Sequence, residues 1–132
     1  MAKPLLFAGL ALLGAIAACG SSGGAPQGAV TDCGTIAYRG GRAVDGATAE
    51  HNAAQCFVTA VHSCHAARLQ LNVMGVDTGT TEVLTVRRAS HHSCVTAVAD
   101  TSSVLGRGDT HRHQVCRTAT VDVDGVDLSD CR

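Results

Sequence analysis

Aromatic side chains are scarce in this chain of 132 residues: tryptophan is absent, and Tyr38, Phe7 and Phe57 are the only aromatic residues. Lysine is also scarce, because Lys3 is the only one and the nine arginines are scattered. With neither an aromatic stacking set nor a basic stripe, the sequence argues against nucleic acid binding. The motifs of common hydrolases and nucleotide-binding enzymes are absent as well, so the sequence predicts a protein that is not an enzyme.

The longest apolar run, from Leu5 to Ala18, is shorter than the roughly twenty residues that a membrane-spanning helix needs. Lys3 precedes this run, and the small residues Ala17 and Ala18 end it. A positive start, a short apolar core and small residues before a cleavage point are the parts of a secretory signal peptide. Residues 1–18 are therefore expected to be a signal that is removed before folding.

Cys19 follows Ile16-Ala17-Ala18 and opens a run of small and polar residues. This arrangement resembles the processing site of bacterial lipoproteins. The resemblance implies that Cys19 carries a diacylglycerol and further acylation (palmitate), which would hold the chain on the cell membrane or the outer membrane. Residues 19–29 are rich in glycine and serine, a composition typical of a flexible tether. The domain at 30–132 would then lie in the periplasm or at the cell surface.

Six cysteines remain in residues 30–132, and an even number in an exported domain predicts three disulfides. The six are Cys33, Cys56, Cys64, Cys94, Cys116 and Cys131. Six cysteines allow about fifteen pairings. Cys56 and Cys64 lie too far apart along one predicted helix to pair with each other. We favour a Cys116–Cys131 bridge across a terminal hairpin, completed by Cys33–Cys56 and Cys64–Cys94.

Hydrophobic periodicity predicts one helix followed by strands. The helix is expected from Thr48 to Ala67, where apolar residues recur every three or four positions. Strands are expected at 35–39, 69–73, 82–88, 94–100 and 114–123, and Asp124-Gly125 predicts a hairpin turn. We therefore expect an α+β domain in which an N-terminal helix packs on a roughly four-stranded antiparallel sheet, in an arrangement similar to cystatins, stapled by three disulfides.

Seven histidines are unusual in a chain of this size. His62 and His65 are spaced to share one helix face, and a Cys64–Cys94 bridge would bring His91 or His92 close to them. Imidazole nitrogens bind Zn²⁺ and Cu²⁺. The sequence thus yields a candidate metal site made of His62, His65 and His92, although no cofactor is required by the rest of the chain.

Three functions are consistent with these features. The first is a non-catalytic binding or interaction module, attached to the membrane by its lipid and contacting an unidentified protein partner. The second is a metal-binding envelope protein that uses the histidines. The third is a small hydrolase, for which no catalytic residues are identified: a pairing such as Ser63 with His62 is disfavoured because neighbours on a helix point away from each other. With its cysteines distributed over the first strand, the helix and the later strands, the domain resembles the small cysteine-rich bacterial lipoproteins of unknown function, and we expect the chain to be one of them.

Overall fold

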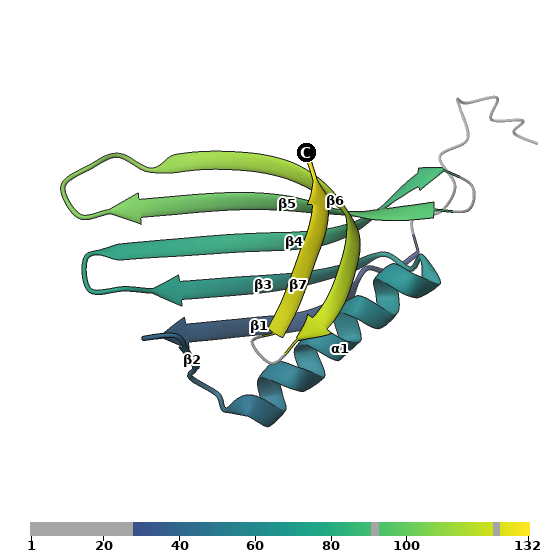
Figure 1. Cartoon of the computed structure of the whole chain (residues 1–132), viewed down its shortest axis with the longest axis horizontal. Helices are drawn as coiled ribbons and strands as arrows, with labels where there is room; N and C mark the ends of the chain where they lie inside the picture. The colour runs from purple at the N-terminus through teal and green to yellow at the C-terminus, as the bar shows by residue number, and fades with distance from the viewer. Residues whose placement is uncertain (1–27, 91–92, 123–124) are drawn as a thin grey trace, which may run out of the picture.

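The computed structural model describes residues 28–90, 93–122 and 125–132, and it consists mostly of strands (Figure 1). The elements in chain order are β1 (Thr31–Arg39), β2 (Arg42–Ala43), α1 (Ala47–Ser63), β3 (Ala67–Met74), β4 (Thr78–Ser90), β5 (Ser93–Val104), β6 (Thr110–Asp122) and β7 (Gly125–Cys131). The strands form a single sheet in the order β2-β1-β3-β4-β5-β6-β7. The expected signal peptide and Cys19 lie outside the described residues.

The sheet is mixed. β1 runs parallel to β3, and α1 is the crossover that connects them. Two parallel neighbours require such a crossover, because a tight turn can only connect antiparallel strands. From β3 to β7 every neighbouring pair is antiparallel. The expectation of a helix on a roughly four-stranded antiparallel sheet is therefore wrong in strand number, in the parallel pair and in the place of the helix.

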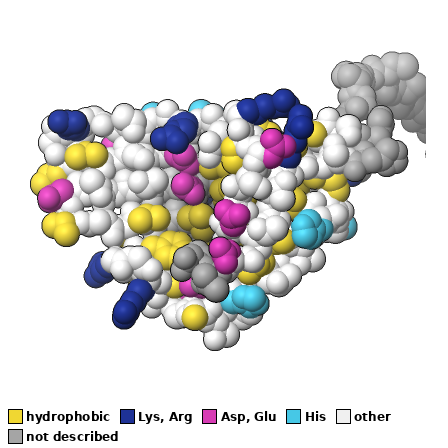
Figure 2. Space-filling model, in the orientation of Figure 1, with side chains coloured by type: hydrophobic (Ala, Val, Ile, Leu, Met, Phe, Trp, Pro, Cys, Tyr) yellow, Lys and Arg dark blue, Asp and Glu magenta, His cyan; other side chains and the backbone are white. Residues whose placement is uncertain are grey.

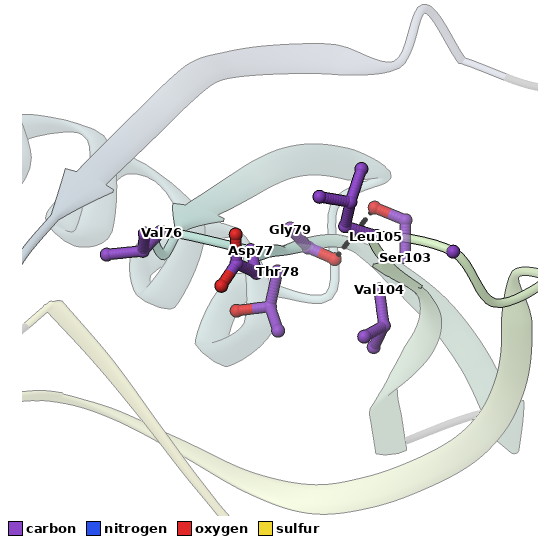
Figure 3. A pocket seen from close by; sticks show the side chains of 8 residues that line it. Val76, Asp77, Thr78, Gly79, Ser103, Val104 and Leu105 are labelled. Carbon is purple, nitrogen blue, oxygen red and sulfur yellow. Dashed lines mark hydrogen bonds between the residues drawn. The ribbon is translucent and has the colours of Figure 1, made fainter.

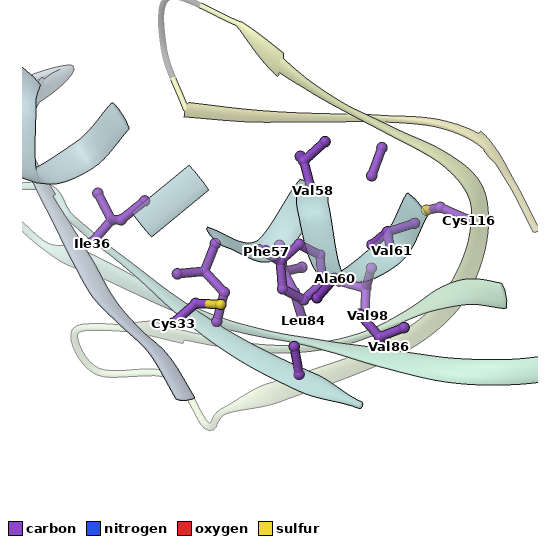
Figure 4. Packing of buried hydrophobic residues seen from close by; sticks show 13 residues of the cluster. Cys33, Ile36, Phe57, Val58, Ala60, Val61, Leu84, Val86, Val98 and Cys116 are labelled. Carbon is purple, nitrogen blue, oxygen red and sulfur yellow. The ribbon is translucent and has the colours of Figure 1, made fainter. Parts of the chain in front are cut away.

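The sheet curls around the helix. The helix α1 contacts β1 and β3 on one side and β5, β6 and β7 on the other. In Figure 1, β6 and β7 bend forward across the sheet toward α1. Phe57, Leu69 and Leu84 are fully buried members of one core cluster. Figure 4 shows Phe57 of α1 beside Leu84 of β4 within it. A flat sheet would cover only one side of this helix, so the curl lets a small set of aliphatic residues form a closed core.

The core covers only part of the inner face of the sheet. Alternate residues of a strand share a face, so Leu84 and Val86 of β4 and Val98 of β5 point to the helix. Farther along the same face, Val73 of β3 is 45% exposed. The part of the inner face that lies beyond the helix is thus open, and we call it the open inner face.

Three disulfides join the elements: Cys33–Cys56 joins β1 to α1, Cys64–Cys94 joins the end of α1 to β5, and Cys116–Cys131 joins β6 to β7. These are the three pairs favoured from the sequence. Disulfides of this number persist in oxidising compartments outside the cytosol, so the chain is an exported protein. In the described ranges no helix has the length and apolar character needed to cross a membrane.

The helix ends earlier than its periodicity predicts. It stops at Ser63, and Cys64 adopts a left-handed conformation with a φ of 57°. The backbone amide of His65 donates to the carbonyl of Ala60, which closes the last turn. Ala67, expected to be the last helical residue, is instead the first residue of β3 and is fully buried. His65 therefore lies beyond the helix, and it does not share a helix face with His62.

The N-terminal end of the helix is fixed by a contact between three elements. The Tyr38 hydroxyl of β1 donates a hydrogen bond of 2.6 Å to Oε1 of Glu50, which lies in the first turn of α1 and is buried. Gly125 of β7 lies directly against the Tyr38 hydroxyl and adopts a φ of 108°. Gly125 was expected in the turn itself, but it pairs with Asp122 as the first residue of β7, while Val123 and Asp124 lie outside the described residues.

Candidate functional site

A row of charged residues crosses the open inner face. Glu82 of β4 pairs with Asp100 of β5, and Asp100 pairs with Arg112 of β6. Glu82 is two residues from Leu84 and Asp100 is two residues from Val98, so both carboxylates are on the same face as the core. Figure 2 shows acidic side chains gathered near the middle of this face with a basic side chain beside them. We call Glu82, Asp100 and Arg112 the charged row.

The two carboxylates of the row are half-buried and face each other across neighbouring strands. Burial raises the pKa of Glu82 above its ordinary value, and the negative charge of Asp100 raises it further. The positive charge of Arg112 lowers that pKa, but by less. Since like charges on directly opposed positions repel, the row stores unfavourable electrostatic energy in the folded protein.

Asp100 has a buried acceptor that the protein does not use. Its Oδ1 is buried, and in the described part of the chain it has no hydrogen-bond partner; Oγ1 of Thr96, deeper in the core, is the other such atom. Arg112 lies on the next strand, but its guanidinium forms no ion pair with either carboxylate; the ion pair seen in the described residues joins Arg117 to Asp130. A buried carboxylate oxygen is usually paired, because leaving it unpaired costs about 1–3 kcal/mol or more.

A small polar hollow of about 220 Å³ lies beside Asp100. Its lining residues are Asp100, Ser102, Thr110, His111 and Arg112. The hydroxyl of Ser102 is 3.2 Å from the hydroxyl of Thr80 on β4. The hollow thus offers a carboxylate acceptor, a guanidinium donor and hydroxyl groups within one small space, which suits a ligand that carries both donors and acceptors.

Chemically, the charged row offers carboxylates, a guanidinium and hydroxyl groups, which can bind a charged ligand. Ser63, which was considered with His62 for a hydrolase, makes other contacts. The Ser63 hydroxyl donates a hydrogen bond of 2.7 Å to the carbonyl of Thr59, an ordinary contact at a helix end. The same hydroxyl oxygen lies 2.9 Å from Nδ1 of His65, so its histidine neighbour is His65 and not His62.

The structure describes two of the three histidines that were expected to bind metal. His62 and His65 are exposed near the end of α1, and His92 lies outside the described residues. No group of three side chains of the metal-ligating types comes together within residues 28–90, 93–122 and 125–132. The site of His62, His65 and His92 for Zn²⁺ or Cu²⁺ therefore stays a prediction of the sequence.

A second unusual surface lies at one end of the sheet. The turns that connect β1 to β2, β3 to β4 and β5 to β6 all lie at this end, which we call the distal end (Figure 1). Two hollows separate these turns, one of about 680 Å³ beside Arg39 and Met74 and one of about 470 Å³ beside Asp77 and Leu105. Figure 3 shows the second hollow, with Val76, Val104 and Leu105 around it.

Comparison with protein-family models, with curated protein sequences and with solved structures gave no match.

The charged row was missed in the sequence. Glu82, Asp100 and Arg112 stand among alternating strand residues, where charged side chains are usually solvent-facing. One signal could have revealed them: Glu82 and Asp100 lie two residues from Leu84 and Val98, so they are on the same face of the sheet as these core residues. Reading that signal requires the strand register, which a single sequence does not supply.

Proposed function

We propose that this chain is a lipid-anchored lipoprotein of the bacterial envelope whose exported domain binds a small polar ligand. The anchor is proposed from Lys3, the apolar run from Leu5 to Ala18, and Cys19. The three disulfides support it, because they use all six cysteines of the described residues, and Cys19 is the seventh cysteine of the sequence. Acyl chains on Cys19 would keep the domain on the cell membrane or the outer membrane.

Lipidation is tested by expressing the full chain and Cys19→Ala in bacteria fed labelled palmitate. The full chain is expected to incorporate the label and to fractionate with membranes. Cys19→Ala is expected to lose the label. A full chain that is exported without label would show that the leader is an ordinary secretory signal and would refute the anchor.

The ligand site is proposed at the charged row, and the observation that carries it is the polar hollow of about 220 Å³ lined by both Asp100 and Arg112. The buried Oδ1 of Asp100, which has no partner among the described residues, supports it. Arg112 lies opposite Asp100 on the neighbouring strand without forming an ion pair with it. A ligand with an ammonium group and a carboxylate could satisfy both side chains at once, since each would gain a charge-assisted hydrogen bond. We therefore propose a small zwitterion as the ligand class.

Binding is tested by amide NMR spectra of the mature chain, residues 19–132 with Cys19→Ala, during titration with glycine and with 4-aminobutyrate. These zwitterions differ in the distance between their charges. Shifts are expected at Glu82, Asp100 and Arg112, and they should be weaker with methylammonium or acetate, which carry one charge each. The variant Asp100→Asn is the matched control and should show no saturable shifts.

Equal shifts with the zwitterions and with the single ions would show simple ion screening and would refute the ligand class. The absence of any saturable shift in the wild-type chain would refute the site itself for zwitterions of this size.

A further inference from the structure

The distal end carries most of the exposed aliphatic surface of the domain. Five of its side chains are large, apolar and exposed: Val73, Met74, Val76, Val104 and Leu105. Val76 is 99% exposed and Leu105 is 81% exposed, and both lie on turns. Single exposed aliphatic residues are ordinary, but a group of them at one end of a domain marks an interaction surface.

The two protruding side chains are held on well-defined turns. The amide of Leu105 donates a hydrogen bond of 2.9 Å to the carbonyl of Asp77, which joins the β5–β6 turn to the β3–β4 turn. Within the turns, Gly75 donates to Thr78 at 2.8 Å and Arg107 donates to Val104 at 2.9 Å. Val76 and Leu105 are therefore presented together, and little conformational entropy is lost when both are buried by another surface.

Basic residues flank this apolar group. Arg39 and Arg42 are exposed on the β1–β2 side, and Arg107 is exposed in the β5–β6 turn. Figure 2 shows basic side chains on both sides of the apolar group at the left end of the molecule. The acidic residues of these turns are Asp77 and Asp109. These three arginines are far apart in the sequence, so only the fold brings them to one end.

We propose that the distal end docks on an anionic lipid bilayer, with Val76 and Leu105 inserted at the level of the headgroups and Arg39, Arg42 and Arg107 on the lipid phosphates. Aliphatic side chains gain from leaving water, and arginines beside them gain from the negative surface potential of the leaflet. Neither gain alone holds a protein on a membrane, but the two act together. This contact does not rest on the lipid at Cys19 or on the ligand at the charged row.

The place of the distal end also decides whether it and a lipid at Cys19 could touch the same bilayer. β1 begins at the opposite end of the sheet, because Thr31 pairs with Ala67 whereas Arg39 pairs with Met74 at the distal end. The tether that precedes β1 comprises residues 19–29 and reaches at most about 38 Å when fully extended. β1 has 9 residues and is therefore about 30 Å long, so a tether of this reach would allow a lipid at Cys19 and the distal end to touch the same bilayer.

The test is co-sedimentation of the mature chain, residues 19–132 with Cys19→Ala so that no lipid contributes, with vesicles of phosphatidylglycerol and phosphatidylcholine. The chain is expected to bind these vesicles, to bind vesicles of phosphatidylcholine alone more weakly, and to lose binding at high salt. Val76→Asp with Leu105→Asp should reduce the partition constant by about tenfold or more.

A matched control replaces two exposed valines elsewhere, Val30→Asp with Val115→Asp, and should bind as the parent chain does. Unfolding curves establish that both variants are folded. A parent chain that binds no vesicles refutes the proposal. So does equal loss of binding in the two variants. A chain that dimerises through Val76 and Leu105 without binding vesicles would assign the distal end to self-association and would also refute it.

Discussion

At the scale of single residues, the carboxylates of Glu50 and Asp100 differ in whether their buried oxygens have a hydrogen-bond partner. Glu50 is buried but accepts a hydrogen bond from Tyr38, so its position serves the fold. Asp100 presents a buried oxygen with no partner in the described residues, next to a second carboxylate on β4. A buried charged group without a partner lowers the stability of the fold, so such a group indicates a role other than folding. Ligand binding is the role that we propose for Asp100.

The pKa of Glu82 predicts how stability depends on pH. Burial and Asp100 raise this pKa in the folded protein. At a pH between the ordinary and the raised value, the folded chain therefore holds a proton on Glu82 that the unfolded chain has released. The stability that Glu82 contributes is therefore full below its ordinary pKa and is lost as pH rises through the raised value. Replacing Glu82 by glutamine, which has no carboxylate to ionise, removes this loss of stability at higher pH.

The variant Glu82→Gln is expected to melt a few degrees above the parent at pH 7, with the difference vanishing near pH 4. Thermal unfolding followed by circular dichroism across this range measures it. Asp109→Asn, an exposed position in the β5–β6 turn, is the control for the removal of one negative charge. A lower melting temperature for Glu82→Gln at pH 7 would show that the carboxylate of Glu82 stabilises the fold.

Gly125 is a residue whose side chain cannot be enlarged. A Cβ placed there would lie 2.5 Å from the Tyr38 hydroxyl, and the φ of 108° is strained for other residues. Gly125→Ala is expected to lower the free energy of unfolding by about 1–3 kcal/mol. Urea denaturation measures the loss. Gly108→Ala, where no atom lies within 4 Å, is the control, and an equal loss there would contradict the role of Gly125.

At the scale of elements, the sequence predicted the helix and the positions of most strands, because α1 and the centres of β3 to β6 have clear apolar periodicity. The strand ends were missed where threonine and serine replace aliphatic residues, as in Thr78–Thr81 and Thr101–Ser103. The parallel pairing of β1 with β3 was missed because periodicity identifies a strand but not its neighbour. The curl of the sheet depends on packing between distant strands, which local patterns do not encode.

The hairpin of β6 and β7 is expected to depend on its disulfide. Cys116 and Cys131 are directly opposed, with a sequence separation of 15. Closing a loop of this length in the unfolded chain is worth about 3 kcal/mol in the chain-entropy model. Cys116→Ala with Cys131→Ala should lose about that amount in urea denaturation. A double variant as stable as the parent would show that the hairpin is held by its packing on α1 alone.

At the scale of the whole molecule, the fold separates three tasks. The helix and the curled sheet form the core at one end, the charged row lies at the border of that core, and the distal end is left apolar and basic. The disulfides tie the helix and the last strand to the sheet, so the small core is sufficient for a stable domain. The central claim is that the charged row is kept for a ligand and not for folding.

The most direct test of this claim is the unfolding free energy of Asp100→Asn, measured by urea denaturation at pH 7 without ligand. If the carboxylate is kept for binding, the variant should be as stable as the parent or more stable by up to about 1 kcal/mol. A loss of about 2 kcal/mol or more would show that Asp100 supports the fold, and it would contradict the account.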